Sequence, residues 1–276
     1  MSDELVKKVT DWLDGQGFPL EMRVARAFFG RDFYVSLSEI YEDPDTSKPR
    51  EIDVLASRSH VVSGVSFEFL FTVECKFSRK KPWVTLSSIG PRRIAPTLSF
   101  HARVASTIGE MLLQELSSLR AVESSPLFSL GPRPAHGVVE AFRDSNEDTP
   151  FKALNAAYHA ARAAASHLDH VRTPAGNKQF VAIVFPLVVL DGRLFDAYLD
   201  QEASLKVEER GWQVVVTKRI GRSPFYSILH LVTEAALPEF LDQASSSIDE
   251  CFKAIPGETG MTLQRALVSD LVEPKR

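Results

Sequence analysis

Two short segments decide the predicted fold, Arg50-Glu51-Ile52-Asp53-Val54-Leu55 and Phe71-Thr72-Val73-Glu74-Cys75-Lys76-Phe77. Both alternate apolar and polar residues with a period of two, which is the pattern of a half-buried strand. If the two strands pair as neighbours through a turn near 59–64, Asp53, Glu74 and Lys76 lie on one face of the sheet. Two acids and an ammonium group would then meet at one place.

The composition is that of an ordinary globular protein. The chain has 276 residues, of which 44% are hydrophobic and 25% charged, with a formal net charge of −4. We expect one α/β domain over 1–276, with a core at 19–200 and a C-terminal extension, 201–276, packed on it. The chain start lacks the pattern of a signal peptide, and the longest apolar run, 180–190, is too short to span a membrane. Cys75 and Cys251 fit buried free thiols in a reducing compartment, so we expect a cytoplasmic protein without membrane attachment.

Hydrophobic periodicity predicts the other elements. Helices are expected at 2–15, 19–29, 102–121, 150–169 and 236–254, and strands at 32–40, 137–142, 180–190, 194–199, 212–217 and 225–232. A polar, proline-bounded loop is expected at 41–49. The Asp191-Gly192 pair between two apolar runs predicts a tight hairpin turn, and Pro82 is expected to break up the segment after Lys76.

That segment is the only markedly basic part of an acidic chain. From Lys76 to Gly109 there are no Asp or Glu residues and seven basic ones, Lys76, Arg79, Lys80, Lys81, Arg92, Arg93 and Arg103. Such a stretch suits an anionic substrate bound at one place, although a loop whose charges simply face water explains it equally well. Lys152 belongs to a polar stripe of helix 150–169, which indicates either a solvated face or a phosphate contact.

The predicted cluster needs a counter-charge. Two carboxylates about 4 Å apart repel by roughly 4 kcal/mol at an effective dielectric near 20. Lys76 supplies one positive charge, and a site with oxygen ligands alone suits Mg²⁺ or Mn²⁺. A metal there would neutralise a scissile phosphate and activate water, while Lys76 orients that water or stabilises charge on phosphorus. The alternative is a surface cluster in which Lys76 only pairs with an acid, which contributes about 0–1 kcal/mol.

The order of these residues resembles the PD-(D/E)XK nuclease superfamily, and its Mrr-like and RecB-like branches most. The resemblance rests on a helix with Glu21, a strand with Ile52-Asp53 and a strand with Glu74-Cys75-Lys76 followed by helices. It covers 19–78, with 150–169 and the strand after it as continuations. Ile52 stands where the family has its name-giving proline. The resemblance implies a restriction-endonuclease-like mixed central sheet flanked by helices, here with an extended C-terminal half.

The resemblance also implies roles for residues. Asp53 and Glu74 would bind Mg²⁺ (or Mn²⁺), Lys76 would serve the attacking water, and Glu21 would join the metal shell. Candidate nucleic-acid contacts are Arg79, Lys80, Lys81, Arg92, Arg93 and Lys152. Glu51 is interpreted as a salt-bridge partner of Arg50 rather than an extra ligand.

The function implied by the resemblance is a metal-dependent nuclease that hydrolyses phosphodiester bonds of DNA, in bacterial defence or repair. RNA is not excluded as a substrate. A homodimer is expected because duplex cutting needs two strand scissions, and a partner subunit of a defence or repair system fits the same role. Two alternatives stay open: a catalytically silent nuclease-fold module that binds nucleic acid or a protein partner, and a scaffold whose acids are incidental.

Overall fold

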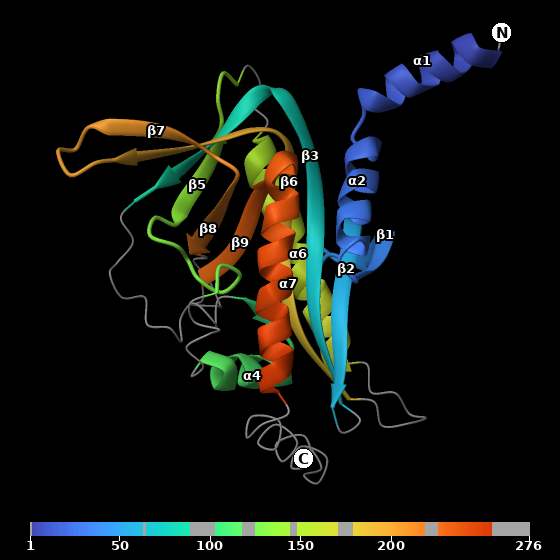
Figure 1. The fold of residues 1–276 in the computed structure, drawn as a ribbon, viewed down its shortest axis with the longest axis vertical. Helices are drawn as coiled ribbons and strands as arrows, with labels where there is room; N and C mark the ends of the chain where they lie inside the picture. The colour runs from blue at the N-terminus through green and yellow to red at the C-terminus, as the bar shows by residue number, and fades with distance from the viewer. Residues whose placement is uncertain are drawn as a thin grey trace.

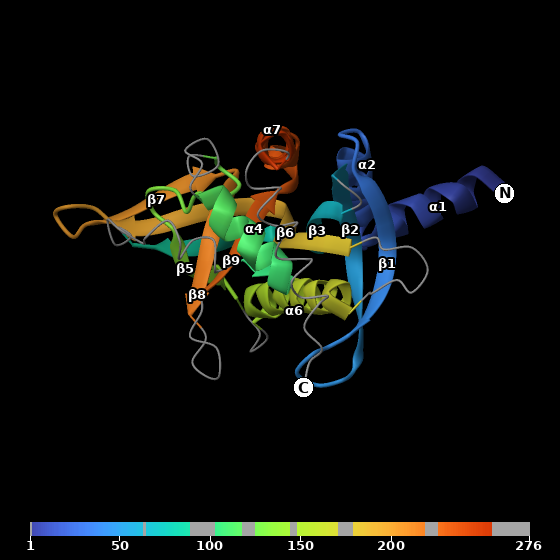
Figure 2. The ribbon, with the colours of Figure 1, turned by 90° about the horizontal axis from the view of Figure 1, so that it is seen from below.

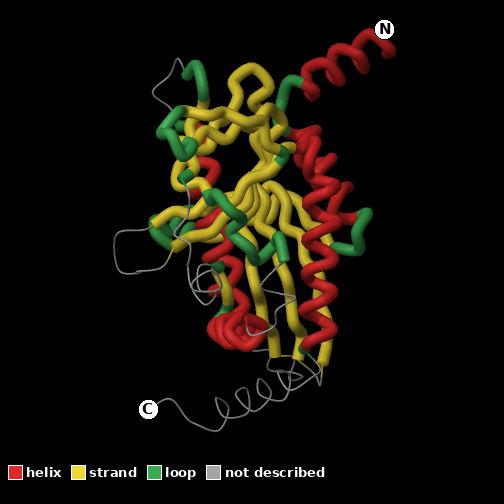
Figure 3. Tube along the Cα trace, turned by 60° about the vertical axis from the view of Figure 1, so that its left-hand side comes forward, coloured by secondary structure: helices red, strands yellow, loops and turns green. Residues whose placement is uncertain are grey.

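A large mixed sheet with helices on both faces forms the protein. The structure, a computed structural model, describes residues 2–62, 65–88, 103–117, 125–143, 148–170, 179–218 and 226–255. Helices α2 and α7 cover one face of the sheet and α6 covers the other (Figures 1 and 2). The long strands run along the molecule between these helices (Figure 3). The mixed α/β class predicted from the sequence is therefore confirmed.

The elements have the following bounds. The helices are α1 (Ser2–Asp14), α2 (Phe18–Phe29), α4 (Thr107–Ser117), α6 (Thr149–His170), the 3₁₀ helix η1 (Glu234–Ala236) and α7 (Leu237–Ala254). The strands are β1 (Tyr34–Glu42), β2 (Pro49–Val62), β3 (Val65–Ser87), β4 (Val104–Ala105), β5 (Ala135–Glu140), β6 (Gln179–Leu199), β7 (Leu205–Arg210), β8 (Trp212–Lys218) and β9 (Tyr226–Thr233).

The sheet has the order β1-β2-β3-β5-β8-β9-β6-β4, and β7 is attached to β6. Strands β1, β2 and β3 form an antiparallel meander, whereas β3 and β6 are parallel. Because β3 pairs with both β5 and β6, the pairings β3-β5-β8-β9-β6 form a closed circuit. Strands β7, β8 and β9, which come from the region after residue 200, thus belong to the same sheet as β2 and β3.

Side-chain alternation along β3 builds two cores. One face carries Phe67, Phe69 and Phe71, which are buried against α2 and α7 in the larger apolar cluster. On the other face, Leu70 packs with alanines of α6, and the hydroxyl of Thr72 donates a hydrogen bond to the carbonyl oxygen of Ala157 at 3.1 Å. The period-two pattern read from the sequence is the direct cause of this division, because successive side chains of a strand point to opposite faces.

The predicted hairpin at Asp191-Gly192 is wrong. Strand β6 runs through both residues without turning, with Asp191 opposite Phe77 and Gly192 opposite Ser78 of β3. A Cβ atom on Gly192 would lie 2.5 Å from the carbonyl oxygen of Ser78. Glycine is needed here for the close approach of two strands, so tertiary packing overrides the local turn propensity.

The expected break at Pro82 is also wrong. Strand β3 continues to Ser87, and its register with β6 shifts between Ser78 and Trp83, where a residue without an N–H group is tolerated. Trp83 is fully buried. Helix α4 begins at Thr107, so the predicted helical start before this residue is wrong for 103–106, whereas 102 and 118–121 lie outside the described residues. Strand β1 extends to Glu42, two residues into the predicted loop.

Candidate functional site

Strand pairing places Asp53 and Glu74 on the same face of the sheet. Val54 lies opposite Val73 and Leu55 opposite Thr72 in the antiparallel β2–β3 ladder. The next residue of each strand, Asp53 and Glu74, therefore shares the face of Leu55 and Thr72. Lys76 follows Glu74 by two residues and lies on that face as well.

The three side chains are held by short polar contacts. Nζ of Lys76 lies 2.5 Å from Oε1 of Glu74. Oδ2 of Asp53 accepts a hydrogen bond from the backbone N–H of Cys75 at 2.7 Å, which ties β2 to β3 beside the cluster. The side chains of Glu74 and Lys76 are 14% and 29% exposed. The cluster is thus largely shielded from water but reachable from it.

Burial dominates the electrostatics of the two acids. It raises the pKa of Glu74 to about 7, helped by the negative charge of Asp53 and opposed by Lys76. Burial also raises the pKa of Asp53, against the hydrogen bond from Cys75 and the charge of Lys76. Burial alone would lower the pKa of Lys76, but the charge and hydrogen bond of Glu74 outweigh it and raise that pKa. One lysine therefore does not compensate both carboxylates.

Glu21 lies beside this cluster, on helix α2. Its neighbour Leu20 is buried in the core, which fixes the first turn of the helix against the sheet. Partial burial raises the pKa of Glu21, and the charges of Asp53 and Glu51 raise it further, while Lys76 lowers it. These mutual effects show that α2 brings a third carboxylate within electrostatic reach of Asp53 and Lys76.

The donor set consists of hard oxygen atoms, which fits a divalent cation such as Mg²⁺. Within the part of the chain that the structure describes, no three His, Cys, Asp or Glu side chains are grouped closely enough to hold a metal. Asp53 and Glu74, at facing positions of β2 and β3, remain the candidate ligands. Glu21 is a neighbour of the pair in this geometry.

The predicted nucleic-acid contacts are scattered. The guanidinium group of Arg79 makes a bidentate pair with Asp191, at 2.9 and 2.8 Å, and lies over the ring of Phe77. Nζ of Lys81 lies 4.0 Å from Glu140, whereas Lys80 and Lys152 are exposed on β3 and α6. Arg92 and Arg93 lie outside the described residues.

Arg103, the last residue of the basic segment, is not on the surface. It is 3% exposed, donates a hydrogen bond to the carbonyl oxygen of Leu127, and lies over the rings of Phe128 and Phe185. The described members of the basic segment thus do not form one continuous positive surface, because they divide among ion pairs, the core and solvent.

Two features near the site were missed by sequence analysis. Tyr41 has a pKa raised to about 12, through burial and the nearby charges of Asp43 and Glu74, although the sequence placed it in a loop. Strand β1 extends through this residue to Glu42, but its side chains do not alternate between buried and exposed, so the sequence carried no clear signal for this position. The polar stripe of α6 also contacts protein rather than only solvent, because Nδ1 of His159 lies 3.3 Å from Asp43.

The expected salt bridge between Arg50 and Glu51 has a different partner in the structure. Nε of Arg50 lies 3.7 Å from Oδ2 of Asp43.

The fold and site define a mixed α/β protein with a half-buried Asp–Glu–Lys cluster on one face of its sheet. The chain matches no protein-family model, and comparisons with curated proteins and with solved structures found no match either. Among the described residues, no helix has the length and apolar character that crossing a membrane requires.

Proposed function

We propose that the protein is a metal-dependent nuclease that hydrolyses phosphodiester bonds of DNA, with Asp53, Glu74 and Lys76 at its active site. The observation that supports this proposal best is the convergence of two carboxylates and one ammonium group at a largely buried place. Buried acids that share one cation are costly, and strongly perturbed pKa values gather at functional sites. The restriction-endonuclease-like arrangement implied by the sequence resemblance belongs to this proposal.

The chain's own residues have distinct tasks in this proposal. Asp53 and Glu74 would hold Mg²⁺, which would supply positive charge to the scissile phosphate and favour deprotonation of the attacking water. Lys76 stays protonated beside Glu74 and stabilises the negative charge that develops on the phosphate as the P–O bond breaks. The hydrogen bond from Cys75 fixes the carboxylate of Asp53, so that this ligand is positioned before substrate arrives.

A second candidate is a nuclease-fold module that binds nucleic acid or a protein partner without cutting. It is favoured by one observation, the lack of a third carboxylate grouped with Asp53 and Glu74 among the described residues. The direct contact between Lys76 and Glu74 fits either candidate, because such a pair also forms where no chemistry takes place.

Cleavage assays distinguish the two. Supercoiled plasmid, linear duplex, single-stranded DNA and RNA are incubated with the protein in Mg²⁺ or Mn²⁺. We expect the wild type to cut DNA, and Asp53→Asn and Lys76→Ala to lose at least about 100-fold in rate. Substrate bound equally by all three proteins, with no cleavage by any, would establish the non-cutting module instead.

Glu68 offers a matched control. It is a half-buried acid on the same face of β3 as Glu74, six residues earlier, and burial alone raises its pKa. We expect Glu68→Gln to keep full cleavage activity. If Glu68→Gln and Asp53→Asn lose activity equally, or if Asp53→Asn keeps it, the assignment of the site is wrong.

A further inference from the structure

A cluster of charged side chains joins the loop between β1 and β2 to helix α6. Nδ1 of His159 lies 3.3 Å from Oδ2 of Asp43, and Nε2 of the same ring lies 3.4 Å from Oδ2 of Asp45. Three residues further along α6, Nη1 of Arg162 lies 2.9 Å from Oδ1 of Asp45. We call these four residues the loop clamp, because they connect two elements that the sheet does not connect.

Asp43 is the buried anchor of the loop clamp. It is 5% exposed, and its Oδ1 accepts hydrogen bonds from the backbone N–H groups of Asp45 and Thr46 at 2.9 and 3.0 Å. Burial opposes its ionisation, but these hydrogen bonds and the contact with His159 outweigh burial and hold the pKa of Asp43 well below its usual range. The loop thus satisfies one carboxylate oxygen by itself, and His159 of α6 provides a donor for the other.

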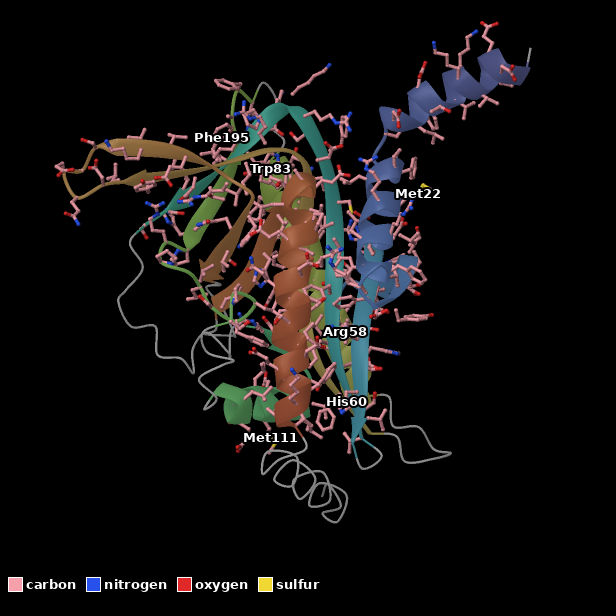
Figure 4. The ribbon with its side chains drawn as sticks, viewed as in Figure 1. Met22, Arg58, His60, Trp83, Met111 and Phe195 are labelled. Atoms are coloured by element: carbon pink, nitrogen blue, oxygen red, sulfur yellow. The ribbon has the colours of Figure 1, made fainter. Side chains whose placement is uncertain are left out.

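Strand β2 leaves β3 next to Asp53. The ladder between the two strands covers residues 54–62 of β2 and stops one residue before Asp53. Arg58 and His60 lie in this paired part of β2 (Figure 4). Residues 49–52 pair only with β1 among the described strands. The end of the β1–β2 hairpin, which carries Asp53, is therefore not fixed to β3 by the ladder between the strands.

We propose that His159 is a positioning residue of the candidate site, which holds the β1–β2 loop on α6 and thereby keeps the carboxylate of Asp53 next to Glu74. Helix α6 is fixed to β3 two residues before Glu74, where the hydroxyl of Thr72 donates to the carbonyl oxygen of Ala157. Ala157 precedes His159 by two residues, so a short path of contacts leads from Glu74 through α6 to the loop. This role rests on the proposed function, because it presupposes that Asp53 and Glu74 act as ligands.

Tyr41 shows that the loop clamp and the site are neighbours. Burial, with the charges of Asp43 and Glu74, raises the pKa of Tyr41 to about 12 against the charge of Arg50. One side chain therefore lies within electrostatic reach of a carboxylate of the clamp and a carboxylate of the site. Tyr41 faces Arg50 in the β1–β2 ladder, three residues before Asp53, so loosening β1 at this point would also loosen the strand that carries Asp53.

The two cysteines make the position of Asp53 measurable without an enzymatic assay. A sample labelled with ¹⁵N only at cysteine gives two amide signals, one from Cys251 in α7 and one from Cys75, whose N–H donates to Asp53 at 2.7 Å. Cys251→Ser assigns the signals, and Asp53→Ala gives the position of the Cys75 signal without its acceptor. We expect His159→Ala to move the Cys75 signal at least halfway to that position and to leave the Cys251 signal unchanged.

Three variants complete this test. His159→Asn should keep the Cys75 signal near its wild-type position, because its amide nitrogen replaces Nδ1 of the imidazole and can donate to Asp43. His167→Ala is the matched control, since this exposed histidine lies on the same helix, and should move neither signal. Asp45→Ala removes the outer half of the clamp at an exposed loop residue, so it should fold and displace the Cys75 signal in the same direction. A Cys75 signal that stays in place in Asp45→Ala and in folded His159→Ala, or that moves as far in His167→Ala, overturns the proposal.

Calorimetric titration with Mg²⁺ separates the positioning role from the proposed function. Groups that orient metal ligands typically contribute about 10–100-fold to metal affinity, so His159→Ala should raise the dissociation constant at least about tenfold and His159→Asn should restore most of the affinity. Equal affinity of His159→Ala and the wild type contradicts the positioning role, while the proposed function stands. A wild type that binds no Mg²⁺ contradicts the proposed function, and the cysteine signals then still decide whether His159 positions Asp53.

Discussion

Replacing Glu74 with glutamine should stabilise the folded protein at neutral and alkaline pH. Burial and the charge of Asp53 raise the pKa of Glu74 from 4.5 to about 7 in the folded state, even with Lys76 present. One pKa unit corresponds to about 1.4 kcal/mol, so ionised Glu74 costs the folded protein about 3 kcal/mol. Glutamine keeps the shape of the protonated acid and carries no charge, so Glu74→Gln removes this cost.

The sign of the pH dependence follows from proton binding. Between pH 4.5 and about 7 the folded state holds more protons at Glu74 than the unfolded state, so this group makes stability fall as pH rises. Glu74→Gln should therefore match the wild type near pH 4.5, gain progressively up to pH 7, and keep a constant advantage of about 3 kcal/mol above it. Because Asp53 is coupled to Glu74, the two acids titrate as a pair and the transition should be broad.

The measurement is urea unfolding of both proteins from pH 4.5 to 8.5, with the difference in free energy of unfolding plotted against pH. Glu68→Gln is the comparison, because burial alone raises the pKa of Glu68; its gain in stability with pH should have the same sign and be smaller than that of Glu74→Gln, whose pKa shift also includes the charge of Asp53. Mg²⁺ should stabilise the wild type by about 2.7 kcal/mol at 100 times its dissociation constant, and should affect Glu74→Gln much less. If the stability difference between Glu74→Gln and the wild type is the same at pH 5 and pH 8, Glu74 is not a buried charge and the reasoning fails.

Two further predictions concern the parallel contact between β3 and β6. Asp191→Asn should lower the free energy of unfolding, because the charge-assisted pair with Arg79 is lost. Lys80→Ala should leave urea unfolding unchanged, because Lys80 is exposed. Gly192→Ala should lower the melting temperature through a loss of roughly 1–3 kcal/mol, because its Cβ would clash with a backbone oxygen of β3 at 2.5 Å. Gly137→Ala is its control, since a Cβ there meets nothing closer than 3.7 Å and calorimetry should detect little change.

The centre of the fold and the placement of the three cluster residues could be predicted because both depend on local alternation. The period of two in β2 and β3 fixes which side chains share a face, whatever the rest of the chain does. Once these strands pair as an antiparallel hairpin, Asp53 and Glu74 lie on the same face. The resemblance to a nuclease family rests on the same residues, and it therefore predicted that Asp53, Glu74 and Lys76 share one face of the sheet. The catalytic role that it implies for them stays a prediction.

The long-range contacts could not be predicted, because residues distant in the sequence determine them. Asp191-Gly192 has the composition of a hairpin turn, but Arg79 of β3 neutralises the acid and the neighbouring strand requires the glycine. Arg103 carries a charge that sequence reasoning assigns to the surface, yet aromatic rings and a backbone carbonyl accept it inside the core. Neither outcome follows from local propensity, which tertiary packing often overrides.

Three acids of the sheet, Asp191, Asp53 and Glu74, lie in two opposite electrostatic environments. Asp191 faces Arg79 at 2.8 Å and Arg23 at 3.4 Å, so two guanidinium groups from β3 and α2 meet one carboxylate and hold these elements together. Asp53 and Glu74 are the opposite case, because two carboxylates share the single positive charge of Lys76 and burial raises both pKa values. Replacing buried ionic groups by neutral ones is often stabilising, so folding alone gives no reason to keep this excess of negative charge. The proposed binding of a cation from solution would supply such a reason, because the cation would offset the charge of the second carboxylate.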